Sequence, residues 1–213
     1  SISSIGNVSM NAYYDEFERM NRRSRPGVLS TTDEVKYWYD GSGNRIGKQY
    51  TYNVQVACDT VPRLSMLEGE SALAADGMEM NLSLPPGNCK ETHTTLTGYY
   101  YFGDDLIAEY TGAAYTGGVL SSNYIYANGE RIAKFTNLGD INYYLTDHLG
   151  SVLCLIDNTG RVKNKTLYRP YGEVHAEEIS TPDPHKYTGH ERDEELGSQW
   201  DNLGKRYYIP GLK

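Results

Sequence analysis

The sequence has few cysteines and no long hydrophobic run. Its 213 residues include three Cys, which excludes a disulfide-dense scaffold, and no Cys-x-x-Cys pair indicates a zinc site. No stretch approaches the roughly 20 apolar residues that cross a bilayer, so membrane insertion is not expected. The net charge of −8 at pH 7 leaves no basic footprint, so nucleic-acid binding is not expected either.

Tyrosine, in contrast, is abundant, with 20 Tyr against three Phe and two Trp. A Tyr ring packs on a pleated sheet while its hydroxyl reaches water or a polar partner. Runs rich in Tyr, Ile and Val, without a sustained helical period, predict strands at residues 99–110, 123–127, 141–146 and 152–156. The chain is therefore predicted to be all-β, with tyrosine carrying much of the burial.

A short turn motif recurs along the chain. The stretch 39–46 joins two strands through an Asp and a Gly, residues 156–162 repeat it, and residues 135–141 and 14–20 are looser copies. Asp caps such a turn through its side chain, and Gly supplies the positive φ of the reversal. A further type I′ hairpin is expected at Asn-Gly. These signals predict an antiparallel meander or spiral of hairpins, with turn residues Asp40, Gly43, Asn128, Gly129, Gly139, Asp157 and Gly160.

Residues 59–90 interrupt this repeated pattern of turns and strands. Leu, Met, Ala and Glu at 63–75 favour a short helix, and Pro-Pro-Gly at 85–87 ends it. Cys58 and Cys89 flank the stretch, either as a disulfide that closes it or as two free thiols. We interpret the chain as hairpins at 1–57, a mixed insertion or cap at 58–90 and further hairpins at 91–142.

Four ordered motifs fill the last part of the chain. YYLTDHLGSV at 143–152 resembles the YYxxDHLGS signature of the core region associated with RHS (YD) repeats, and the motifs at 167–173, 186–197 and 204–210 resemble YDPFGE, YTGKERDEETG and GARYYDP. The resemblance makes residues 143–213 the core region. Its motif residues are Tyr143, Tyr144, Asp147, His148, Gly150, Ser151, Tyr171, Gly172, Gly189, Glu191, Arg192, Arg206, Tyr207 and Tyr208.

RHS proteins and the shell-forming subunits of insecticidal toxin complexes share this region. The resemblance implies a large spiral of β-hairpins that encloses a C-terminal effector polypeptide, and in many members an aspartyl self-cleavage just beyond the core. Here Arg169 and Ile209 stand where the family has Asp, and the chain ends at Lys213 before the next DPxG segment. Aspartyl proteolysis needs two carboxylates that share a proton, so we assign no catalytic residue.

Other reactive residue types have structural interpretations. Asp147, His148 and Ser151 are the types of a hydrolase triad but are nearly adjacent, so we expect turn contacts from the Asp and Ser, and packing or hydrogen bonding of His148 within the shell wall. We expect a solvated charged turn at 190–195, surface positions for His175 and His185, and a buried apolar role for Cys154. No metal or cofactor is expected.

These patterns favour a non-enzymatic section of a secreted or bacterial cell-surface YD-repeat β-shell. Its expected partners are the remainder of a larger YD-repeat polypeptide or copies of itself. Two alternatives remain open. Unpaired strand edges could assemble copies into an extracellular filament or coat, or residues beyond 213 could complete a self-cleaving protease.

Overall fold

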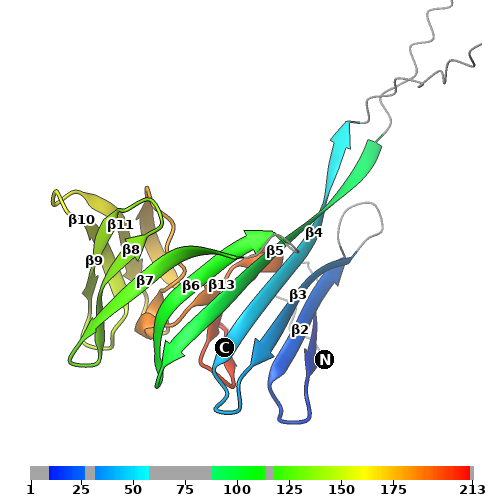
Figure 1. Ribbon diagram of the computed structural model, residues 1–213, viewed down its shortest axis with the longest axis horizontal. Helices are drawn as coiled ribbons and strands as arrows, with labels where there is room; N and C mark the ends of the chain where they lie inside the picture. The colour runs from blue at the N-terminus through cyan, green and yellow to red at the C-terminus, as the bar shows by residue number, and fades with distance from the viewer. Residues whose placement is uncertain (1–9, 27–31, 58–87, 114–117, 212–213) are drawn as a thin grey trace, which may run out of the picture.

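The computed structural model describes residues 10–26, 32–57, 88–113 and 118–211, and these are almost entirely β (Figure 1). One 12-stranded antiparallel sheet runs in chain order, each strand bonded to the next. This confirms the all-β meander. Its strands are β1 (Asn11–Tyr14), β2 (Met20–Pro26), β3 (Thr32–Tyr39), β4 (Arg45–Ala57), β5 (Asn88–Phe102), β6 (Asp105–Ala113), β7 (Val119–Ala127), β8 (Glu130–Thr136), β9 (Ile141–Thr146), β10 (Val152–Asp157), β11 (Val162–Tyr168) and β12 (Val174–Ile179).

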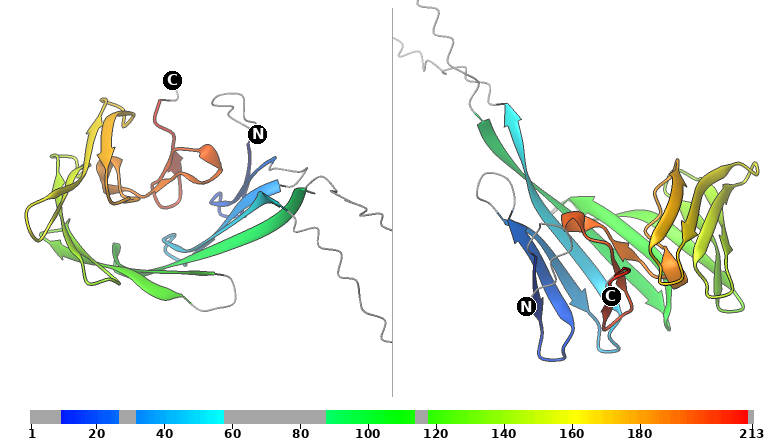
Figure 2. Two further views of the ribbon diagram at one scale, coloured as in Figure 1. Left: turned by 90° about the horizontal axis from the view of Figure 1, so that it is seen from above. Right: turned by 180° about the vertical axis from the view of Figure 1, so that it is seen from behind.

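The sheet curves around the end of the chain. Figure 2 shows residues 181–211, which we call the C-terminal segment, lying inside the curve of the sheet, which we call the wall. The segment holds a small second sheet and two 3₁₀ turns: β13 (Arg192–Asp193), β14 (Trp200–Asn202), β15 (Tyr207–Tyr208), η2 (Tyr187–Gly189) and η3 (Glu195–Gly197). Within the described ranges, no helix is long and apolar enough to cross a membrane.

One five-residue turn links many of the strands. At Asp40, the backbone N–H donates to the carbonyl of Asn44 at 2.9 Å, and Oδ1 accepts from the Asn44 N–H at 2.8 Å. Asp15, Asp147 and Asp157 head turns with the same pattern. The backbone reversal and the Asp side chain thus stabilise each other, as expected for a capped turn.

The fourth position of this turn has a positive φ. Glycine occupies it in most copies, for example Gly43 at 95° and Gly160 at 85°, but Glu18 adopts 59° in the first turn. Asn128 and Gly129 also have positive φ, at 54° and 78°, as a type I′ hairpin requires. The Gly and Asn-Gly positions that the sequence marks as turns therefore lie in turns of the structure.

Side chains of the wall alternate between two faces. On β3, Val35 and Tyr37 are buried on the inner face, whereas Trp38 is exposed on the outer face. On β9, Tyr144 is buried and Tyr143 is exposed. This two-residue period follows from strand geometry, and it gives the wall one face that packs against the C-terminal segment.

Strands β4 and β5 pair as far as Ala57 and Asn88, so residues 88–90 belong to β5. The predicted helix at 63–75 and Cys58 lie outside the described residues. Cys89 is disulfide-bonded. At the other boundary, residue 143 lies within β9, so the core region and the preceding hairpins share one sheet.

Candidate functional site

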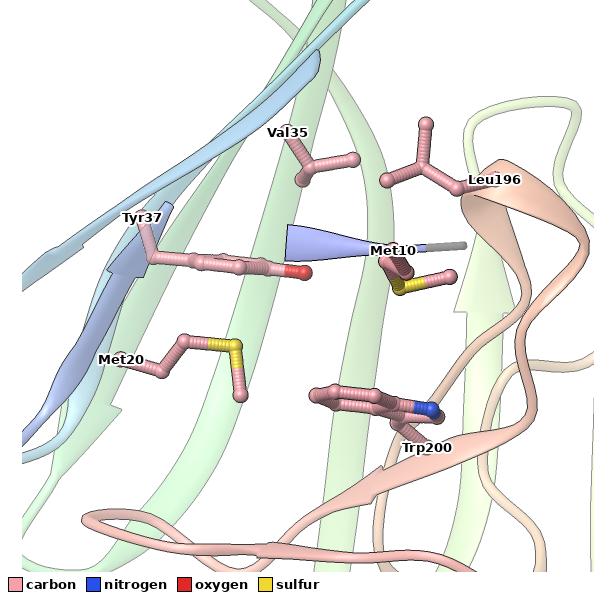
Figure 3. Packing of buried hydrophobic residues seen from close by; sticks show 6 residues of the cluster. All are labelled: Met10, Met20, Val35, Tyr37, Leu196 and Trp200. Atoms are coloured by element: carbon pink, nitrogen blue, oxygen red, sulfur yellow. The ribbon is translucent and has the colours of Figure 1, made fainter. Parts of the chain in front are cut away.

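The C-terminal segment packs on the wall through a hydrophobic cluster. Leu196 and Trp200 of the segment face Met20, Val35 and Tyr37 of the wall (Figure 3). Val35 is fully buried, and Met20 and Leu196 are each 2% exposed. Burial of one such side chain stabilises a protein by about 1.5–3 kcal/mol, so this cluster is a substantial part of the contact.

Next to this cluster lies an ion-pair site, which joins three carboxylates of the segment to three cations of the wall. Its residues are Glu191, Asp193 and Glu195 with Arg23, Arg45 and Lys48. Glu191 and Asp193 are two residues apart in an extended stretch, which directs both to one side, and Glu195 follows at the start of η3. The N–O distances include 2.7 Å from Arg45 Nη1 to Asp193 Oδ2, 2.9 Å from Lys48 Nζ to Glu191 Oε1 and 2.7 Å from Lys48 Nζ to Glu195 Oε1.

Tyrosine hydroxyls complete the ion-pair site. The hydroxyl of Tyr99 donates to Glu191 Oε1 at 2.8 Å, and Arg45 Nη1 donates to the hydroxyl of Tyr207 at 3.0 Å. Arg23 Nε likewise donates to the hydroxyl of Tyr37 at 2.7 Å. The abundant tyrosines therefore supply buried polar partners as well as apolar surface.

These groups are charged at neutral pH despite their burial. Burial tends to raise the pKa of Glu191, but the charges of Arg45 and Lys48 outweigh it and lower that pKa to about 2. The same balance of burial and nearby cations holds the pKa of Asp193 well below its usual value. A buried charge of this kind is tolerated because it has its partner, and loss of one partner leaves the other uncompensated.

Arg192 points away from the wall cations and holds the segment to a different hairpin. Its Nε and Nη2 donate to the two carboxylate oxygens of Asp201 at 2.6 and 2.8 Å, and Nη2 also donates to the carbonyl of Gly172 at 3.0 Å. Arg192 is 3% exposed and Asp193 is fully buried. The expected solvated turn at 190–195 is therefore wrong, because wall cations pair with Glu191 and Asp193, and Arg192 pairs with Asp201 inside the segment.

A second buried polar group, the Lys134 cluster, consists of Lys134, Asp183, Tyr144, His185 and Glu109. Lys134 Nζ donates to Asp183 Oδ2, and the hydroxyl of Tyr144 donates to the same oxygen at 2.9 Å. The imidazole of His185 lies with Nδ1 3.4 Å from Asp183 Oδ1 and Nε2 4.0 Å from Glu109 Oε1. His185 is 1% exposed, so its expected surface position is wrong.

Protonation differs sharply among these groups. Burial, together with the negative charges of Glu191 and Asp183, raises the pKa of Glu109 to about 7. Burial also lowers the pKa of His185 to about 4, helped by the charge of Arg131. At neutral pH the imidazole is therefore neutral, and much of Glu109 keeps its proton.

The first core motif forms a turn that touches the C-terminal segment. Asp147 Oδ1 accepts the backbone N–H groups of Leu149 and Ser151 at 2.8 Å each, and Gly150 has φ 83°. Ser151 Oγ accepts the N–H of Thr188 at 3.1 Å. His148 is exposed rather than packed within the wall, so Asp147, His148 and Ser151 do not form a triad.

The remaining motif residues lie mostly along contacts of the segment. Gly172 is buried, and the hydroxyl of Tyr208 donates to the carbonyl of Tyr171 at 2.8 Å. Gly189 accepts from Arg131 through its carbonyl at 3.3 Å. Arg206 is exposed, as is His175, and Cys154 is half-buried rather than buried.

A pocket of roughly 630 Å³ lies between the segment and several hairpin turns. Its lining includes Asp104, Tyr126, Arg131, His148 and His190. In the part of the chain that the structure describes, no group of three or more His, Cys, Asp or Glu is placed to hold a metal ion. Sequence reasoning pointed neither to this pocket nor to the wall side of the two buried polar groups.

Comparison with solved structures relates this architecture to Tc toxins. The crystal structure of TcdB2-TccC3 matches with a TM-score of 0.61 and 15% identity, over 94% of this chain and 9% of that one. This chain has the fold of a section of TcdB2-TccC3. The Photorhabdus luminescens Tc holotoxin pore with mutation TccC3-D651A matches with a TM-score of 0.60 and 14% identity, over 94% of this chain and 8% of that one.

Among curated proteins, the chain is similar to the tRNA3(Ser)-specific nuclease WapA of Bacillus spizizenii. The two are 27% identical over 124 residues, which is 57% of this chain and 5% of WapA. No family model matches. The chain thus spans less than a tenth of the length of each of these proteins.

Proposed function

We propose that this chain is a non-enzymatic section of a secreted YD-repeat β-shell that encloses or presents a C-terminal polypeptide. The observation that carries the proposal is the curved wall with the C-terminal segment buried on its inner face. The core motifs and the fold shared with TcdB2-TccC3 support it. Strands β1 and β12 have open edges in the described sheet, where further strands of a longer polypeptide would continue the wall.

Electron microscopy of the protein from the complete reading frame tests this role. A hollow particle with this section in its wall is expected. A solid particle, or one with the β1 and β12 edges exposed to solvent, would contradict it. The nuclease activity for which WapA is named is not assigned to this section, and tRNA incubated with the purified chain is expected to stay intact.

The open edges also favour a second candidate function, a self-assembling filament or surface coat. Unpaired edge strands present backbone donors and acceptors to other chains. Light scattering of the purified chain separates the two roles, since stable monomers would eliminate the filament.

Self-cleavage by a core completed beyond residue 213 is a third candidate, and it is the enzymatic one. It concerns Ile209, which stands at a family Asp position and is half-buried beside the hydrophobic cluster. Mass spectrometry of a C-terminally extended chain, with and without Ile209→Asp, tests it. An extended chain that stays intact in both forms would remove this candidate.

A further inference from the structure

The side chains of Lys134 and Asp183 are in direct contact out of solvent. Lys134 Nζ donates to Asp183 Oδ2, and the two side chains are 5% and 0% exposed. Lys134 belongs to wall strand β8, whereas Asp183 belongs to the C-terminal segment. An amine is therefore held against a carboxyl group at the junction of two parts of the fold.

We propose that Lys134 and Asp183 condense into an isopeptide bond that fixes the C-terminal segment to the wall. The amine nitrogen attacks Cγ of Asp183, so that a C–N bond forms and one C–O bond breaks. The departing oxygen leaves as water with two of the three ammonium protons. Ammonium and carboxylate thus give one amide and one water, the net charge is unchanged, and no oxidant, reductant or cofactor is consumed.

The surrounding groups match the needs of this reaction. The hydroxyl of Tyr144, 2.9 Å from Asp183 Oδ2, stabilises the negative charge that develops on this oxygen during attack. His185 Nδ1 lies 3.4 Å from Oδ1, which is therefore the leaving oxygen. A neutral imidazole can donate a proton from one nitrogen and accept one at the other.

Glu109 is the acid that supplies a proton to His185. Its Oε1 lies 4.0 Å from His185 Nε2 and makes no hydrogen bond within the described part of the chain. With its pKa raised to about 7 by burial and by Glu191 and Asp183, Glu109 holds a proton that His185 can relay to the leaving oxygen. The attacking amine returns a proton by the same route.

The starting state is an ion pair, and two physical effects favour its condensation. Hydrogen bonds from His185 and the charge of Lys134 outweigh burial and hold the pKa of Asp183 low, so the ammonium group must lose a proton before its nitrogen can attack. Fixing the reactants in contact offsets this barrier, because effective molarities of oriented groups reach about 10⁵ M or more. Desolvated charges are costly, and condensation replaces them with a neutral amide.

Other lysine–carboxylate contacts in the described chain lack one of these features. Lys48 is shared among three carboxylates, and Arg45 also pairs with two of them, so no single carboxyl group is held against its amine. Lys186 contacts Glu177, whose side chain is 21% exposed to water. The buried pair with an adjacent protonated carboxyl group is Lys134–Asp183.

Intact-mass measurement of the reduced, denatured full chain tests the bond. The mass is expected to be lower than the sequence mass by one water, and tandem mass spectrometry should join the peptide that contains Lys134 to the peptide that contains Asp183. A full sequence mass, or a water lost elsewhere, overturns the proposal. The measurement does not depend on the proposed shell role, because it concerns this chain alone.

Matched variants separate chemistry from folding. Lys134→Arg keeps the cation and should retain the full mass, and Glu109→Gln keeps the side-chain size and should slow bond formation by about 100-fold or more. Lys186→Arg, at the partly exposed pair, should still lose one water. A Lys134→Arg chain that loses water, or a Glu109→Gln chain that reacts at the normal rate, would contradict the assigned roles, with circular dichroism confirming that each variant is folded.

Discussion

Arg45 of strand β4 and Asp193 of strand β13 are 148 residues apart in the chain, yet Arg45 Nη1 lies 2.7 Å from Asp193 Oδ2. Both side chains are fully buried. This pair joins the wall to the C-terminal segment, and each member depends on the other because neither charge reaches water. Removing one member of the pair should therefore lower the free energy of unfolding by a measurable amount.

Asp193→Ala should strongly destabilise the protein. The substitution leaves Arg45, Lys48 and Arg23 facing fewer carboxylates inside the fold. Breaking a buried pair in this way costs about 3–5 kcal/mol. Urea denaturation followed by tyrosine and tryptophan fluorescence should show this loss in the free energy of unfolding.

Lys36→Ala is the matched control for this experiment. Lys36 Nζ lies 3.0 Å from Glu34 Oε2, but its side chain is 45% exposed. An exposed pair contributes about 1 kcal/mol or less. If the two substitutions cost the same free energy of unfolding, the ion-pair site does not hold the segment to the wall.

Acid should weaken the same contact through Glu191. Burial raises its pKa, but Arg45 and Lys48 lower it to about 2 from the usual 4.5. A carboxyl group whose pKa is lower in the folded state than in the unfolded state stabilises the fold at pH values above its unfolded-state pKa. This stabilisation is lost as the pH falls through the folded-state pKa. The difference corresponds to about 3 kcal/mol, lost between about pH 4.5 and 2.

Glu191→Gln removes this titration and should flatten the pH dependence in that window. The free energy of unfolding of both proteins, measured from pH 6 downward, gives the comparison. Wild-type and variant curves that stay parallel below pH 4.5 would show that Glu191 is not held by the wall cations.

The turns could be predicted from the sequence because their interactions are local. Asp40 caps a turn that ends only four residues later, and Gly43 needs no distant partner to adopt its positive φ. The same reasoning predicted the all-β meander, since short Tyr-rich runs between such turns favour strands. Even Arg169 keeps the backbone turn without the Asp carboxylate.

The ion-pair site and the Lys134 cluster could not be predicted, because their partners come from distant strands. Nothing near His185 in sequence indicates that Glu109 lies beside it. One signal was present: Glu191 and Asp193 alternate with other residues, as side chains on one face of an extended segment do. Three carboxylates at this spacing indicate a common cationic partner, which charge composition alone does not.

Gly172→Ala should destabilise the protein more than Gly160→Ala. Both glycines have similar positive φ, 81° and 85°, so an added Cβ strains both turns by about 1–2 kcal/mol. At Gly172 the new Cβ would also lie 2.6 Å from the Tyr187 ring, whereas at Gly160 it meets nothing within 4 Å. Thermal unfolding of the two variants compares them directly, and equal melting temperatures would mean that the Tyr187 ring moves aside freely.

Trp200→Ala should loosen the C-terminal segment from the wall. Trp200 is 8% exposed, and its ring lies 5.0 Å from the Arg23 guanidinium carbon and 6.2 Å from the Tyr207 ring centre. Loss of a buried aromatic side chain costs about 3–5 kcal/mol. Because the contacts of Trp200 with Arg23 and with the wall side of the hydrophobic cluster are lost, limited proteolysis should cut within residues 181–211 sooner than in the wild type.

Phe102→Ala is the control for Trp200→Ala, because Phe102 lies at the end of β5 and is 80% exposed. An exposed substitution of this kind changes stability by about 0.5 kcal/mol or less. Its proteolysis pattern should match the wild type. If Trp200→Ala instead accelerates cleavage equally along the whole chain, the segment and the wall unfold as one unit, and the hydrophobic cluster stabilises the entire fold rather than the docking of its last 30 or so residues.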